Sequence, residues 1–200
     1  MLSAQQFLTA LGDAMPLSWP DAAIPSDGGR WAGWVTRALH RAAATSGLSC
    51  CCEDGPHGQE GDVVHGVPRG YNRRHVYDMT WYASWETWEL PCVAIQHRNP
   101  HRFDAWLQDH WQLQMSAIPL RVSLGFTSEP GDWPTWQALL QQVSDAHSWP
   151  TPPQCEDLVL LGHTGVRTDG MRVLARRGAA WEDAGTLAEH RPNAGAASTA

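Results

Sequence analysis

Lysine is absent from this sequence: all 14 basic residues are arginines, set against 21 aspartates and glutamates in a chain of 200 residues. Mechanisms that need a lysine amine, such as Schiff-base formation, are therefore excluded. The formal net charge of −7 gives the chain as a whole no attraction to phosphate backbones. A nucleic-acid ligand would have to be held by a local cluster of arginines.

Long apolar runs and an organised cysteine pattern are also missing. No stretch approaches the roughly 20 apolar residues that a membrane helix needs, and the N-terminal segment lacks the basic region that opens a signal peptide. The five cysteines are odd in number, and three of them are adjacent at Cys50, Cys51 and Cys52, which does not suit a disulfide framework. We therefore expect a cytoplasmic protein with reduced thiols and no membrane partner.

Several common catalytic motifs are missing as well. The chain has no GxSxG nucleophile elbow and no CxxC pair, and without lysine it cannot contain a P-loop. The glycine-rich segment GHTGVRTDG is most simply the turn of a β-hairpin. Serine-hydrolase, thiolate-zinc and P-loop nucleotide chemistry therefore have no support in the sequence.

The residues that are present predict a folded α/β domain. Apolar positions repeat at helical spacing in four segments, at residues 3–15, 28–45, 101–115 and 133–149. Runs of β-branched, aromatic and aliphatic residues predict six strands, at residues 48–52, 73–83, 91–98, 119–126, 157–163 and 171–177. The order α-α-β-β-β-α-β-α-β-β predicts a mixed central sheet flanked by helices. We expect one domain over residues 1–182 and a flexible C-terminal tail over residues 183–200.

The segment VAIQHRNP, residues 93–100, begins as an apolar strand and ends in the polar residues Gln96, His97 and Arg98. Side chains alternate along a strand, so Gln96 and Arg98 share one face and His97 lies on the other. One strand earlier, Asp78 interrupts the apolar run HVYDMTWY. A carboxylate there costs free energy unless a charge, a hydrogen bond or a metal compensates it. If the two strands pair, Asp78 lies beside Gln96 and Arg98.

With Asp78 on the second strand and Gln96-x-Arg98 on the third, residues 28–126 resemble the core of the PD-(D/E)XK, or restriction-endonuclease-like, nuclease superfamily. The resemblance implies a core of order α-β-β-β-α-β, to which this chain adds a helix and a β-hairpin. In that superfamily an Asp on the second strand and an acidic-x-Lys pair on the third bind Mg²⁺ and activate water for phosphodiester hydrolysis. Asp78 stands at the position of the Asp, Gln96 at that of the acidic residue, which some branches also replace by Gln, and Arg98 at that of the Lys.

The implied catalytic set of Asp78, Gln96 and Arg98 departs from the superfamily pattern. The amide oxygen of Gln96 is a weaker ligand for Mg²⁺ or Mn²⁺ than a carboxylate. Arg98 stays protonated and cannot act as a base, but it can hold the scissile phosphate. A further metal ligand could come from the acidic residues that follow the first strand: Glu53, Asp54, Glu60 or Asp62. The sequence leaves open whether such a site is active.

Basic residues gather on the same strands and predict a patch that could bind DNA or RNA. Those nearest the proposed site are Arg73, Arg74, His97 and Arg102. Two alternatives to a nuclease remain. One is an inactive member of the same fold that binds nucleic acid or a protein partner, as in a phage, defence or immunity setting. The other is an unrelated α/β protein in which Asp78 forms a structural pair with Arg74 or Arg98, worth about 0–1 kcal/mol if exposed.

Overall fold

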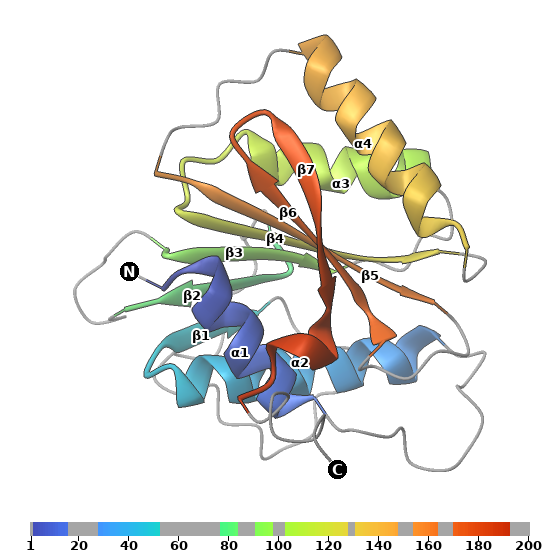
Figure 1. Cartoon of the computed structure of the whole chain (residues 1–200). Coiled ribbons are helices and arrows are strands. Elements are labelled where there is room, and N and C mark those ends of the chain that lie inside the picture. Colours follow the sequence, from blue (N-terminus) through green and yellow to red (C-terminus); the bar gives the residue numbers. More distant parts are fainter. Residues whose placement is uncertain are drawn as a thin grey trace.

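The computed structural model describes residues 2–15, 28–52, 77–83, 91–97, 103–127, 131–147, 154–163 and 170–192. Within these ranges the chain forms four α-helices, a short 3-10 helix and one seven-stranded mixed sheet (Figure 1). The helices are α1 (Ala4–Ala14), α2 (Gly28–Thr45), α3 (Phe103–Gln114), α4 (Trp133–His147) and the 3-10 helix η3 (Leu187–His190). The strands are β1 (Ser49–Cys52), β2 (Met79–Tyr82), β3 (Val93–His97), β4 (Leu120–Thr127), β5 (Glu156–His163), β6 (Arg172–Arg177) and β7 (Ala180–Thr186). The predicted α/β class is therefore confirmed.

The strands lie in the sheet in the order in which they occur in the chain, from β1 to β7. The pairs β3/β4 and β4/β5 are parallel, and α3 and α4 provide the two crossovers. The other neighbouring pairs are antiparallel. Figure 1 shows α1 and α2 on one side of the sheet and α3 and α4 on the other, so the fold has three layers. No helix in the described ranges has the length and apolar character needed to cross a membrane.

The helix ends follow local signals that are visible in the sequence. The spacing of Ser3 and Gln6 predicts a capping box, and both of its bonds are present: the Ser3 hydroxyl accepts from the Gln6 N–H, and the Gln6 side chain accepts from the Ser3 N–H. Gly47 adopts a φ of 69° directly after α2, and its N–H bonds to the carbonyl of Ala44. This left-handed conformation suits glycine and ends the helix where the sequence predicted.

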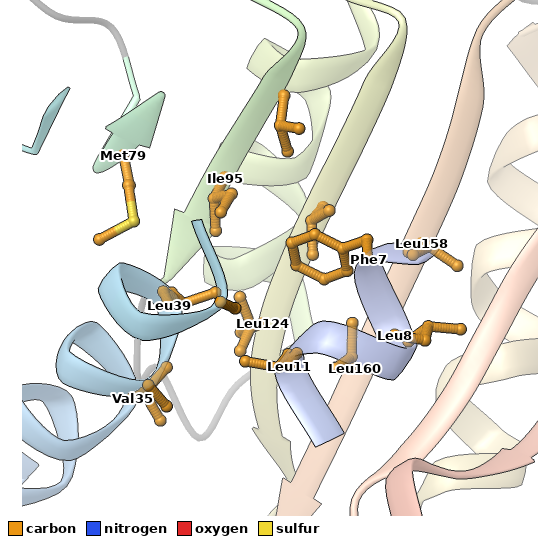
Figure 2. Packing of buried hydrophobic residues seen from close by; sticks show 14 of the residues in the cluster. Phe7, Leu8, Leu11, Val35, Leu39, Met79, Ile95, Leu124, Leu158 and Leu160 are labelled. Atoms are coloured by element: carbon orange, nitrogen blue, oxygen red, sulfur yellow. The ribbon is translucent and has the colours of Figure 1, made fainter. Parts of the chain in front are cut away.

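The side of the sheet that faces α1 and α2 is packed almost entirely with apolar side chains. Figure 2 shows Phe7 and Leu11 of α1 and Leu39 of α2 directed toward strand residues such as Ile95 and Leu160. All of these side chains are at most 1% exposed. Because the helices and strands enclose this layer completely, it forms the main hydrophobic core.

The side of the sheet that faces α3 and α4 combines an aromatic cluster with buried polar groups. Trp106 of α3 lies 5.2 Å from Trp136 of α4, measured between ring centroids, and both rings cover Gly125 of β4. A Cβ atom at Gly125 would come within 2.8 Å of the Trp106 indole nitrogen, so this close packing requires glycine. The helical spacing of Trp106 and Trp111 predicts that both belong to the core, but Trp111 is 37% exposed, so this prediction is wrong for Trp111.

A buried ion pair joins the middle of the sheet to the end of α3. Arg121 of β4 donates from Nε and Nη2 to the two carboxylate oxygens of Asp157 on β5, at 2.6 and 2.9 Å. Its remaining Nη1 donates to the carbonyls of Gln114 and Ser116 at the C-terminal end of α3. Both charged side chains are 1% exposed. The pair therefore fixes two strands and one helix end in a single contact.

The predicted flexible tail from residue 183 is wrong for residues 183–192. Gly178, with a φ of 63°, lies in a two-residue turn that reverses the chain from β6 into β7. Trp181 and Leu187 are 4% and 0% exposed, and Arg191 donates to the carbonyl of Met15 just beyond α1. The hairpin and η3 therefore belong to the packed domain, and the signal that the sequence analysis missed is the turn at Gly178.

Replacement of Asp157 by asparagine should lower the free energy of unfolding by about 3–5 kcal/mol, because Arg121 would stay buried without its counterion. Urea denaturation measures this loss. The matched control is Glu182→Gln, which breaks the exposed pair of Arg177 and Glu182, with side chains 78% and 53% exposed. The control should cost at most about 1 kcal/mol. Equal losses for the two variants would contradict the structural importance of the buried pair.

Truncation of Leu187 to alanine should cost about 2–5 kcal/mol, since its side chain is fully buried against the main core. The same change at Leu139, which is only partly buried on α4, should cost less. Urea denaturation of both variants makes the comparison. If residues beyond 183 formed a flexible tail, Leu187→Ala would leave the midpoint unchanged.

Candidate functional site

The structure brings Asp78 to the end of β3. Asp78 was predicted to lie on the second strand, but β2 begins at Met79, so Asp78 directly precedes the strand. β2 pairs with β3 in an antiparallel register that sets Met79 opposite Ile95. The Oδ2 atom of Asp78 accepts a hydrogen bond of 2.7 Å from the backbone N–H of His97. This backbone donor partly offsets the free-energy cost of placing the Asp78 carboxylate in an apolar segment. The same bond fixes the carboxylate next to the Gln96-His97 peptide.

Gln96 and His97 face opposite sides of the sheet, as the strand alternation predicts. The neighbouring residues Val93 and Ile95 belong to the core beside α1 and α2, whereas Ala94 packs with α3. Gln96 therefore shares the α3 side of the sheet with Ala94, next to Ser123 in the parallel register of β3 and β4. Alternation along one strand thus separates the two polar side chains of the predicted site.

The side chain of Gln96 is buried, and its carbonyl oxygen is unsatisfied. Gln96 is 3% exposed, and Oε1 has no hydrogen-bond partner among the described residues. An unpaired buried acceptor costs about 1–3 kcal/mol, so such an atom marks either strain or the place of an additional donor or cation. Among the predicted site residues that the structure describes, Gln96 has the clearest capacity to accept a ligand.

A buried histidine and serine lie beside Gln96, and neither belongs to the site that the sequence predicts. His110 of α3 lies with its Nδ1 atom 2.8 Å from the hydroxyl oxygen of Ser123 on β4. Its ring stacks on Trp106 at a centroid distance of 5.0 Å. Burial lowers the pKa of His110 to about 4, although Asp157 opposes the shift and Arg121 and Arg176 add to it. The imidazole is therefore neutral at pH 7. The contact between His110 and Ser123 connects α3 to the row of the sheet that contains Gln96.

His97 is also uncharged at neutral pH. Burial lowers its pKa to about 4. His97 was predicted to belong to the basic patch, and in its neutral form it adds no positive charge to attract a phosphate. Any electrostatic attraction at this position must therefore come from the arginines.

The other predicted site residues, Glu53, Arg73, Arg74, Arg98 and Arg102, lie outside the described residues. In the part of the chain that the structure describes, no three His, Cys, Asp or Glu side chains gather where they could hold a metal ion. The described portion of the site thus consists of one carboxylate, Asp78, and one buried amide oxygen, that of Gln96. These oxygens are of the type that Mg²⁺ and Mn²⁺ prefer.

Comparisons of the chain with protein-family models, with curated proteins and with solved structures find no match.

Stability should fall as the pH is lowered from about 6.5 to 4. In this window the unfolded chain binds a proton at His110 and at His97, whose pKa values are near 6.5 when unfolded and about 4 when folded. Each histidine therefore contributes a slope of about 1.4 kcal/mol per pH unit, with the stability fully present above pH 6.5. Urea denaturation at several pH values measures the slope.

The variant His110→Gln should reduce that slope, because glutamine keeps hydrogen-bonding groups but does not titrate. Gln112→Ala, on the exposed side of the same helix, is the matched control and should leave the slope unchanged. An unchanged slope in His110→Gln would show that the folded protein admits the proton at His110 near its ordinary pKa.

Proposed function

We propose that this chain is a nuclease-related protein with a restriction-endonuclease-like core, and that it hydrolyses phosphodiester bonds of nucleic acid with the help of a divalent metal. The order α2-β1-β2-β3-α3-β4 supports this proposal, since it is the element order that the resemblance implies. The observation that carries it is the hydrogen bond from the His97 N–H to Asp78, which holds a carboxylate next to the Gln96-His97 peptide at the end of β3.

The proposed metal would be held by oxygen atoms of Asp78 and Gln96, with Glu53 as the third ligand. The unsatisfied Oε1 atom of Gln96 fits this role, because a buried amide oxygen without a donor can be compensated by a cation. A bound Mg²⁺ or Mn²⁺ would supply a water of lowered pKa and stabilise charge on the phosphate. Asp78 is already held in place by the backbone of β3, so it would need little reorganisation to accept such an ion.

The arginines of this region would bind the nucleic acid. Arg98 would hold the scissile phosphate, and Arg73, Arg74 and Arg102 would contact phosphates along the backbone. The net charge of −7 makes this local cluster essential, since the remainder of the chain repels a polyanion. Neutral His97 would contribute hydrogen bonding at most.

A second function in the same fold is binding without catalysis, to nucleic acid or to a protein. It is favoured by the composition of the described site, in which Asp78 supplies the carboxylate and Gln96 a neutral amide in place of a second one. The absence of lysine also removes the usual partner of the acidic residue on the third strand. A site with these substitutions could retain its shape and lose its activity.

The decisive experiment is a cleavage assay on DNA and RNA with Mg²⁺ or Mn²⁺. We expect metal-dependent cleavage by the wild-type protein and a loss of at least about 100-fold in Asp78→Asn and in Gln96→Ala. Asparagine at position 78 can still accept the His97 N–H, so this variant removes the charge and leaves the local fold intact. The matched controls are Asp145→Asn and Gln108→Ala, at exposed positions on α4 and α3.

Each outcome separates the two functions. Cleavage that persists unchanged in Asp78→Asn would rule out the proposed site. Binding of nucleic acid that weakens steeply with salt, without cleavage in any metal, would favour the binding module. If the protein shows neither cleavage nor salt-dependent binding of nucleic acid, the remaining version of the second function is binding to a protein partner.

A further inference from the structure

Three charged side chains lie in one row across the sheet, on the side covered by α3. In the strand register Arg121 of β4 is opposite Asp157 of β5, and Asp157 is opposite Arg176 of β6. The row therefore contains two guanidinium groups and one carboxylate. Arg176 is three strands away from β3, which at the usual strand spacing of about 4.8 Å separates it from Gln96 by roughly 14 Å.

The carboxylate of Asp157 is already used by other donors. Arg121 donates to both of its oxygens, and the side-chain amide of Gln114 donates to Oδ1 at 2.9 Å. The Nη1 atom of Arg121 donates to the carbonyls of Gln114 and Ser116, where the partial negative charge of the α3 C-terminus lies. Arg121 therefore has a carboxylate counterion, and each of its three side-chain nitrogens has a hydrogen-bond partner.

Arg176 is not satisfied in the same way. Its side chain is 5% exposed, and its Nη1 lies 3.8 Å from Asp157 Oδ2, beyond hydrogen-bond distance. Nη1 donates to the neutral Oε1 of Gln114 at 3.2 Å, and the buried Nε has no hydrogen-bond partner among the described residues. Of the other titratable groups near the row, His110 is neutral at pH 7. Arg121 and Arg176 therefore share the carboxylate of Asp157, and the described residues of the row provide no second carboxylate for Arg176.

A buried guanidinium with an unpaired donor is costly, and the physical remedy is an anion. Burial lowers the pKa of Arg176, Asp157 opposes this shift, and Arg121 adds to it. Arginine binds planar or tetrahedral oxyanions through parallel N–H bonds, and Nε with a terminal nitrogen provides such a pair. Arg176 also lies near the margin of the buried layer, because it is the next-to-last residue of β6 and the chain turns at Gly178.

We propose that Arg176 forms a binding site for a compact oxyanion, a phosphate or carboxylate group, between the C-terminal end of α3 and strand β6. The anion accepts from Nε of Arg176 and neutralises the excess charge of the row of Arg121, Asp157 and Arg176. Gln114 positions the guanidinium by accepting from Nη1. This site is separate from the end of β3, and it does not depend on nuclease activity.

The test measures the Tm of the full-length protein in increasing inorganic phosphate, with sodium chloride adjusted to keep the ionic strength constant. We expect a saturable rise of about 3–6 °C at a tenfold excess over Kd, since an anion that binds only the folded state stabilises it by mass action. A parallel titration with sodium acetate distinguishes a phosphate site from a carboxylate site. A saturable rise with either anion that depends on Arg176 supports the proposal.

The variant Arg176→Met should abolish the saturable rise, and Arg177→Met, one residue away and exposed, should retain it. Arg176→Lys keeps the charge but loses the Nε donor, so its rise should need at least about tenfold more anion. It also serves as the test variant if Arg176→Met does not fold. A rise of equal size and midpoint in the wild type and in the Arg176 variants would place the anion elsewhere and overturn the proposal. The absence of a saturable rise in the wild type with both anions would overturn it as well.

Discussion

The buried contact between Arg121 and Asp157 is the interaction on which the α3 side of the sheet depends. It joins β4 to β5 and, through Nη1 of Arg121, holds the carbonyls at the C-terminal end of α3. A helix held at that end places His110 over Ser123, one row of the sheet further along β4. The ion pair of Arg121 and Asp157 therefore influences the surroundings of Gln96 through α3, because α3 contacts both the row of Arg121 and the row of Ser123 and Gln96.

The two sides of the sheet differ in how their burial is stabilised. The side under α1 and α2 is apolar, and its stability comes from close packing of aliphatic and aromatic side chains (Figure 2). The side under α3 and α4 buries polar residues such as Gln96, Ser123 and Asp157 among its aromatic residues. Buried polar groups contribute less to stability than apolar groups of the same volume unless every donor and acceptor is paired. The unsatisfied atoms of Gln96 and Arg176 are both on this side, which is why both proposed ligand sites lie there.

Much of the fold was predictable from residue pattern because its signals are local. The four helices and five of the first six strands lie within two residues of their predicted positions, since capping at Ser3, the glycine after α2 and alternation in β3 all act over short distances. The second strand, predicted from residue 73, begins only at Met79. The exceptions also have local causes. Trp111 fits the helical spacing of the buried face but lies at its edge, and the turn at Gly178 went unrecognised, so β7 was assigned to a flexible tail. The restriction-endonuclease-like identity of the core remains a proposal.

The sequence by itself determined that Asp78 would lie next to Gln96 across neighbouring segments, although Asp78 directly precedes β2 instead of lying within it, and that Gln96 and His97 would face opposite sides of the sheet. Both follow from element order and from the two-residue period of a strand. Only the tertiary structure decided how these groups are compensated: which donor satisfies Asp78, that burial makes His97 and His110 neutral at pH 7, and that Arg121, Asp157 and Arg176 form one row. The physical reason is that desolvation and ion pairing depend on residues far apart in the chain, whose proximity arises from strand register and from the helix packed above it.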